Sequence, residues 1–82
     1  MILVDVYVPA VDKEYNFSLD EEVSVKTILD EIIEMIEQKE QTKLKGNQDD
    51  MLLCDKKNGK VLARTNSLKE CGILNGDSMI LV

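Results

Sequence analysis

The sequence predicts an α+β domain in which one helix packs against a mixed sheet of four or five strands. Residues 24 to about 39 carry apolar side chains at helical spacing, and no other stretch of similar length does. The segments on either side alternate apolar and polar residues, or are short apolar runs between turn signals, as is typical of strands. A chain of 82 residues can bury one modest core, so we expect a single domain over residues 1–82.

The predicted helix has one broad apolar side and one polar side. Ser24 is placed to cap its first turn, and Val23 and Ile28 can contact each other across that turn. An apolar side this wide is not stable alone in water, so the helix must cover a sheet. The apolar positions are Val25, Ile28, Leu29, Ile32, Ile33, Met35 and Ile36.

The strands are predicted from alternation and from turn residues. Residues 2–8 and 15–19 alternate apolar and polar side chains around a turn at 9–13, which predicts a hairpin before the helix. After a polar loop at 41–50, which contains Gly46-Asn47, residues 51–54 and 61–63 form a second hairpin around Asn58-Gly59.

The end of the chain is predicted to hold a short turn and a final strand. Ser67 can cap a short helical turn, Gly72 is a left-handed stop, and residues 78–82 form the last strand. A helix crossover between the first hairpin and the later strands favours a last strand parallel to the first. This element order predicts a β-grasp fold.

Composition and motifs argue against catalysis and metal binding. The net charge of −6 disfavours nucleic acid and anionic membranes as partners, and the chain has no histidine to act as a base or a metal ligand. The apolar N-terminal run is interrupted by Asp5 and Pro9, so we expect neither a signal peptide nor a membrane span. The carboxylates of residues 24–39 are interpreted as a solvated helix face. We therefore expect no enzyme activity and no cofactor.

Two cysteines, Cys54 and Cys71, stand without a C-x-x-C motif. They are too few for a zinc or iron–sulfur site, so we expect no metal. We predict two reduced, mostly buried thiols in a cytoplasmic protein, with Cys54 facing the core; a disulfide is the alternative.

The closing segment SLKECGILNGDSMILV resembles the same segment of ubiquitin-like domains, and Cys71 to Asp77 (C-G-I-L-N-G-D) is similar to the YukD family. These are small ubiquitin-like proteins of bacterial type VII secretion systems, which export WXG-motif proteins. The resemblance implies an accessory or regulatory component whose protein partner is a cytoplasmic domain of a membrane component. Ubiquitin and the sulfur carriers use a Gly-Gly tail; the sequence ends at Val82, so we expect no conjugation chemistry.

The candidate binding surface is the sheet face turned away from the helix. If Val4, Val6, Met79 and Leu81 face the helix, alternation places the intervening residues on the other face. Leu53 joins them if Leu52 and Cys54 are core. Contiguous apolar patches mark interfaces, and ubiquitin binds partners through the corresponding surface. The predicted protein-binding residues are Leu3, Tyr7, Leu53, Ile80 and Val82.

Three readings stay open beside this one. Lys56, Lys57, Lys60 and Arg64 make the second hairpin basic and could dock an acidic partner, although solubilising charge at a sheet edge explains them as well. A sulfur-carrier protein that has lost its Gly-Gly tail is a second alternative. The third is a self-associating module, a homodimer whose partner is a second copy.

Overall fold

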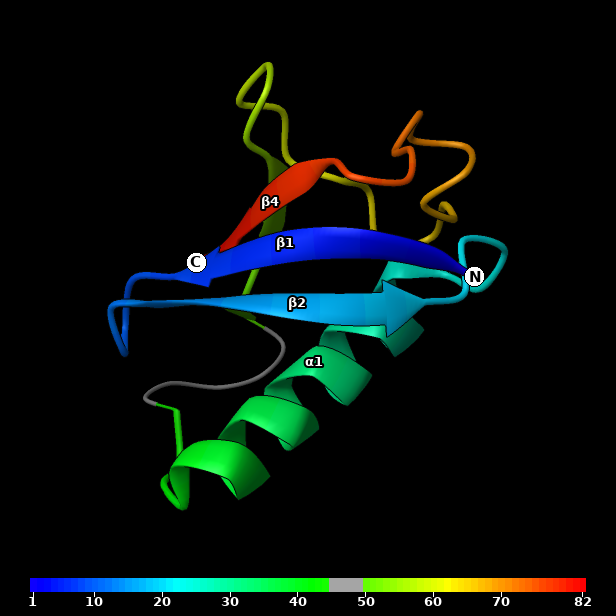
Figure 1. Cartoon of the computed structure of the whole chain (residues 1–82). Helices are drawn as coiled ribbons and strands as arrows, with labels where there is room; N and C mark the ends of the chain where they lie inside the picture. Colours follow the sequence, from blue (N-terminus) through cyan, green and yellow to red (C-terminus); the bar gives the residue numbers. More distant parts are fainter. Residues whose placement is uncertain (45–49) are drawn as a thin grey trace.

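The structure is a computed structural model, and it describes residues 1–44 and 50–82. Four strands form one mixed sheet in the order β2-β1-β4-β3, and the single long helix of the described residues lies against one side of it (Figure 1). The predicted β-grasp fold is confirmed. The elements in chain order are β1 (Ile2–Val8), β2 (Lys13–Leu19), α1 (Val25–Glu40), β3 (Leu53–Asp55) and β4 (Ser78–Leu81).

The predicted N-terminal hairpin is present. β1 and β2 run antiparallel with Val4 opposite Phe17 and Val6 opposite Tyr15, so the buried residues of both strands share one face. β4 lies parallel to β1 on its other side, with Met79 beside Val6. The crossover through α1 supplies the length of chain that a parallel pair needs.

The helix begins at the predicted cap. The Ser24 hydroxyl accepts a hydrogen bond from the Thr27 amide at 3.3 Å, which satisfies one of the unpaired donors of the first turn. Six of the seven predicted apolar positions are buried. Met35 is the exception, with 40% of its surface exposed, because it lies at the edge of the arc and beside Glu34. Its assignment to the core was wrong.

The second half of the chain is less regular than predicted. Val61 makes a single bridge to Cys54 rather than a strand, so the sheet has four strands. Ser67 and Glu70 cap each other reciprocally, but they close a turn and not a helix. Gly72 has a φ of +77°, as its role as a left-handed stop requires. The predicted Gly46-Asn47 loop signal lies outside the described residues.

The core between helix and sheet is almost wholly aliphatic. Side chains from all four strands and from α1 contribute to it, and Leu68 and Ile73 close the end near the start of the helix. Ile28, Ile32 and Leu81 are within 1% of complete burial. The core therefore fixes which residues of each strand remain for the opposite face of the sheet.

Candidate interaction surface on the outer sheet face

One row of paired residues crosses the outer face of the sheet, which is the face turned away from α1. Tyr7 lies beside Ile80, and Ile80 lies beside Cys54 on its other side. Cys54 is bridged in turn to Val61, which is 54% exposed. Paired residues of neighbouring strands point to the same face, so these four side chains form one continuous row.

A second pair extends this row toward the C-terminal end of β4. Leu52 and Val82 exchange both backbone hydrogen bonds, with N···O distances of 2.6 and 2.9 Å. Their side chains are 38% and 52% exposed. Together with the row they form the outer cluster, which consists of Tyr7, Leu52, Cys54, Val61, Ile80 and Val82.

Leu53 does not belong to this surface, so the prediction that its side chain faces outward was wrong. It pairs with Leu81, and both are buried against the helix. The prediction made Leu52 and Cys54 core residues, whereas the structure places both on the outer face. Residues 51–54 are all apolar, so the sequence contains no alternation that shows which of them face inward. The pairing of β3 with β4 determines which of them face the core.

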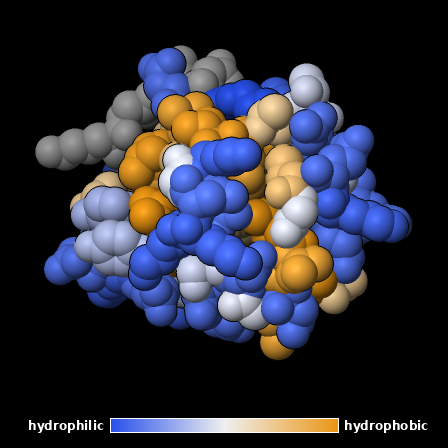
Figure 2. Space-filling model, turned by 90° about the horizontal axis from the view of Figure 1, so that it is seen from above, coloured by the Kyte–Doolittle hydropathy of each residue, from blue (hydrophilic) through white to orange (hydrophobic). Residues whose placement is uncertain are grey.

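Leu3 is exposed, as predicted, but it lies apart from the outer cluster. Leu3 and Tyr7 are four positions apart along β1, which is about 13 Å. The polar pair Asp5 and Ser78 occupies the space between them. The view from above likewise shows apolar surface (orange) in separate groups with hydrophilic residues (blue) between them (Figure 2). Of the five predicted residues, the structure therefore brings together Tyr7, Ile80 and Val82.

The phenol of Tyr7 is held in place at the edge of the outer cluster. Its hydroxyl donates a hydrogen bond to Asp12 Oδ1 at 2.7 Å. That bond raises the pKa of Tyr7 above its usual value, because it stabilises the protonated phenol. A tyrosine with a fixed ring and a polar end is a typical residue of protein interfaces.

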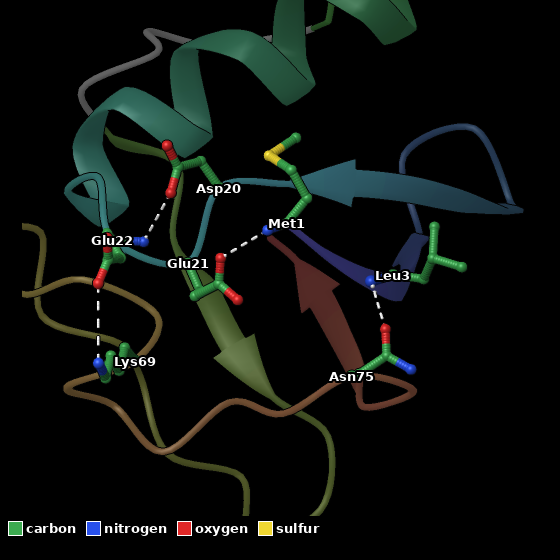
Figure 3. Close-up of polar contacts among 7 residues, drawn as sticks. All are labelled: Met1, Leu3, Asp20, Glu21, Glu22, Lys69 and Asn75. Atoms are coloured by element: carbon green, nitrogen blue, oxygen red, sulfur yellow. Dashed lines mark hydrogen bonds and ion pairs between the residues drawn. The ribbon is translucent and has the colours of Figure 1, made fainter.

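A second surface feature lies near the start of β1, where a groove of about 460 Å³ is lined in part by Ile2, Ile73 and Leu74. Its charges are already paired (Figure 3). The Met1 ammonium lies 2.9 Å from Glu21 Oε1, and Lys69 Nζ lies 3.7 Å from Glu22 Oε1. The first of these contacts raises the pKa of the ammonium and lowers that of the Glu21 carboxyl.

Side chains that bind metals are not clustered in the described part of the chain. There, no three His, Cys, Asp or Glu side chains are arranged to hold a metal ion. Cys54 and Cys71 are both partly exposed and free. Cys54 lies on the outer face and not in the core, so its predicted orientation was wrong.

Within residues 1–44 and 50–82, no helix has the length and hydropathy to span a membrane.

The fold and the outer face define a ubiquitin-like domain, and similar structures agree. The N-terminal ubiquitin-like domain of the 4931431F19Rik protein is 26% identical with a TM-score of 0.76, and the match covers 99% of this chain and 72% of that one. The UBL domain of Plasmodium falciparum Dsk2 is 22% identical with a TM-score of 0.76, covering 99% and 95%. Caldiarchaeum subterraneum ubiquitin is 17% identical with a TM-score of 0.73, covering 98% and 89%.

A family match identifies the chain more specifically than its fold does. Residues 3–81 match the family described as "WXG100 protein secretion system (Wss), protein YukD". The chain therefore belongs to the YukD family, as the resemblance of Cys71 to Asp77 predicted. Comparison with curated proteins gave no match.

Proposed function

We propose that this protein is a non-enzymatic, accessory or regulatory component of a WXG100 secretion system that binds a protein partner through the outer cluster. The partner is a cytoplasmic segment of one of the system's membrane components, and the protein acts in the cytoplasm. Membership of a family of secretion-system components supports the system. The absence of histidine supports a binding role over acid–base catalysis.

The outer cluster is the observation that carries the proposal. Ile80 in β4 and Val82 just after it are β-branched hydrophobes on the sheet face that the core does not use, where polar residues would serve a purely structural strand equally well. Tyr7 adds an aromatic ring with a polar end. Interface centres are enriched in aromatic and large apolar side chains, and their rims in polar ones. This face has that composition.

Ile80 is the residue on which to test the proposal, because it lies at the middle of the row. The substitution Ile80→Lys places a charge in the outer cluster and leaves the core face of β4 unchanged. We expect the variant to fold, as judged by circular dichroism, and to lose binding to purified cytoplasmic segments of the secretion system's membrane components. Isothermal calorimetry with the wild-type protein identifies which segment binds.

Leu74→Lys is the matched control. Leu74 is also a large exposed hydrophobe, at 68%, but it lies at the groove near the start of β1. The proposal requires this variant to bind like the wild type. It is contradicted if Ile80→Lys folds and binds normally, if Leu74→Lys alone abolishes binding, or if no membrane component of the system binds the wild type.

A further inference from the structure

Charge is distributed unevenly across the outer face of the sheet. Three acidic residues lie on the side of β1 and β2, where Glu14 pairs with Tyr7 and Asp12 accepts the bond from its phenol. The third, Asp5, lies in the next row. Three exposed lysines, Lys56, Lys57 and Lys60, lie at the opposite edge of the sheet, in and after the turn that follows β3. Lys56 is the one that belongs to the outer face, because Leu53 and Asp55 are buried and strand residues alternate between faces.

Two of these charges have a definite spatial relationship through β4. Ser78 pairs with Asp5 on one side, and its carbonyl accepts a hydrogen bond from the Lys56 amide on the other. Asp5 and Lys56 therefore flank β4 at the same level. Ile80 occupies the corresponding middle position one row further along, between Tyr7 and Cys54. An acidic edge, an apolar centre and a basic edge follow one another across the sheet.

We infer that the outer face pairs with the outer face of a second copy of this chain, about a two-fold axis that runs along β4 between the two sheets. A two-fold axis brings a surface against itself. An axis along β4 leaves Ile80 opposite Ile80 of the second copy and places each acidic edge over the other copy's lysines. Asp5 then opposes Lys56 of the second copy, twice in each dimer.

The charge pattern selects this axis over the alternative. An axis across the strands would place the acidic edges against each other and the lysines against each other, which costs free energy. Strands aligned along a common direction are one of the two usual arrangements of stacked sheets.

This inference goes beyond the proposed function and shares only the surface with it. A dimer of this kind covers the outer cluster, so a secretion-system partner must displace the second copy. The face is narrow, and small interfaces associate weakly. We therefore expect reversible self-association that is visible at high protein concentration and does not need any other component.

Charge exchange between Asp5 and Lys56 tests the axis directly. In Asp5→Lys, two lysines face each other at both contacts, and in Lys56→Asp two carboxylates do. Each variant alone should dimerise at least tenfold more weakly than the wild type in sedimentation equilibrium. An equimolar mixture should form heterodimers, because both contacts are then between opposite charges. Native mass spectrometry with one variant tagged distinguishes these heterodimers from homodimers by their mass.

Matched controls separate the effect of a charge at the dimer contact from the effect of the protein's net charge. Glu31→Lys and Lys43→Asp change the net charge by the same amounts at exposed positions in and just after α1, and they should dimerise like the wild type. Because Asp5 accepts a hydrogen bond from Asn16 at 2.9 Å, its variant is checked by thermal unfolding. If Asp5→Lys does not fold, Asp5→Asn replaces it, since this change removes the charge at the contact and keeps the size of the side chain, and it should also dimerise more weakly than the wild type.

Three results would overturn the inference. The wild type could remain monomeric in sedimentation equilibrium up to about 1 mM, the dissociation constant of a very weak complex. The single variants could dimerise as strongly as the wild type. The mixture could remain as monomeric as its components. Because these measurements contain no other protein, none of them bears on partner binding, which the Ile80→Lys assay decides separately.

Discussion

Tyr7 and Ile80 lie side by side in parallel strands that are 73 residues apart in the sequence. Both are partly exposed, whereas their neighbours Val6 and Met79, also paired, are completely buried. A shift of one residue in this pairing would exchange the two sets, with the apolar core residues moved to the solvent. The core therefore holds the outer cluster in place, and the predictions below test both faces.

Ile32 tests the packing of the helix. Its side chain is completely buried between α1 and the sheet, so Ile32→Ala should lower the free energy of unfolding by about 2–5 kcal/mol. Met35→Ala, at the exposed edge of the helix, should change it by about 0.5 kcal/mol or less. Urea denaturation measures both. Equal effects of the two substitutions would show that the buried side of the helix is misassigned.

Leu52 and Leu53 test the register of β3. Leu53 is completely buried and pairs with Leu81, so Leu53→Ala should cost about 2–5 kcal/mol. Leu52 faces outward, and Leu52→Ala should cost about 1 kcal/mol or less. The two residues are chemically identical neighbours, so their difference reports orientation alone. A larger loss of stability in Leu52→Ala than in Leu53→Ala would mean that Leu52 faces the core and Leu53 faces outward, as the sequence predicted.

The Tyr15 hydroxyl should lose its proton at a higher pH than an ordinary tyrosine does. Its hydroxyl donates a hydrogen bond to Glu40 at 2.9 Å, and burial together with that bond raises the pKa of Tyr15 to about 12. The stability that this phenol contributes is present below its ordinary pKa of 10 and is lost as the pH rises from 10 to 12. Absorbance titration should show a step near 12 that Tyr15→Phe removes. Persistence of that step would assign it to Tyr7.

Glu40 should make stability fall at acid pH. Lys13 lies 2.7 Å from its carboxylate, and this contact and the Tyr15 hydroxyl lower the pKa of Glu40 below its ordinary 4.5. A lowered pKa means that the contribution to stability is complete above 4.5 and is lost as the pH falls through the folded-state value. The difference in unfolding free energy between wild type and Glu40→Gln should therefore shrink below pH 4.5. A constant difference would contradict this.

The two thiols should be reduced, and the thiol of Cys71 should react slowly. Titration of the denatured protein, prepared without reductant, should count two thiols and no bound zinc. In native Cys54→Ser, the remaining Cys71 should react slowly at neutral pH, because burial raises the pKa of its thiol and thiolate is the reactive form. A stoichiometric disulfide or rapid reaction of Cys71 would be inconsistent with its environment.

The sequence by itself determined the elements whose pattern is local. Ser24 caps α1, and residues 2–8 alternate, because a cap needs only the amides of the next turn and alternation needs only one buried face. Gly72 takes its left-handed conformation for a similar reason, since that geometry is set within a few residues.

Tertiary structure decided the composition of the outer face. Residues 51–54 are uniformly apolar, so either orientation of β3 satisfies the local sequence, and the pairing of Leu53 with Leu81 selects one. The same pairing brings Cys54 and Val61 to the surface beside Ile80. Leu3 lies apart from Ile80 because β4 begins at Ser78 beside Asp5, and so pairs with β1 only from Asp5 onward. Contacts between strands distant in sequence depend on register, which no single strand encodes.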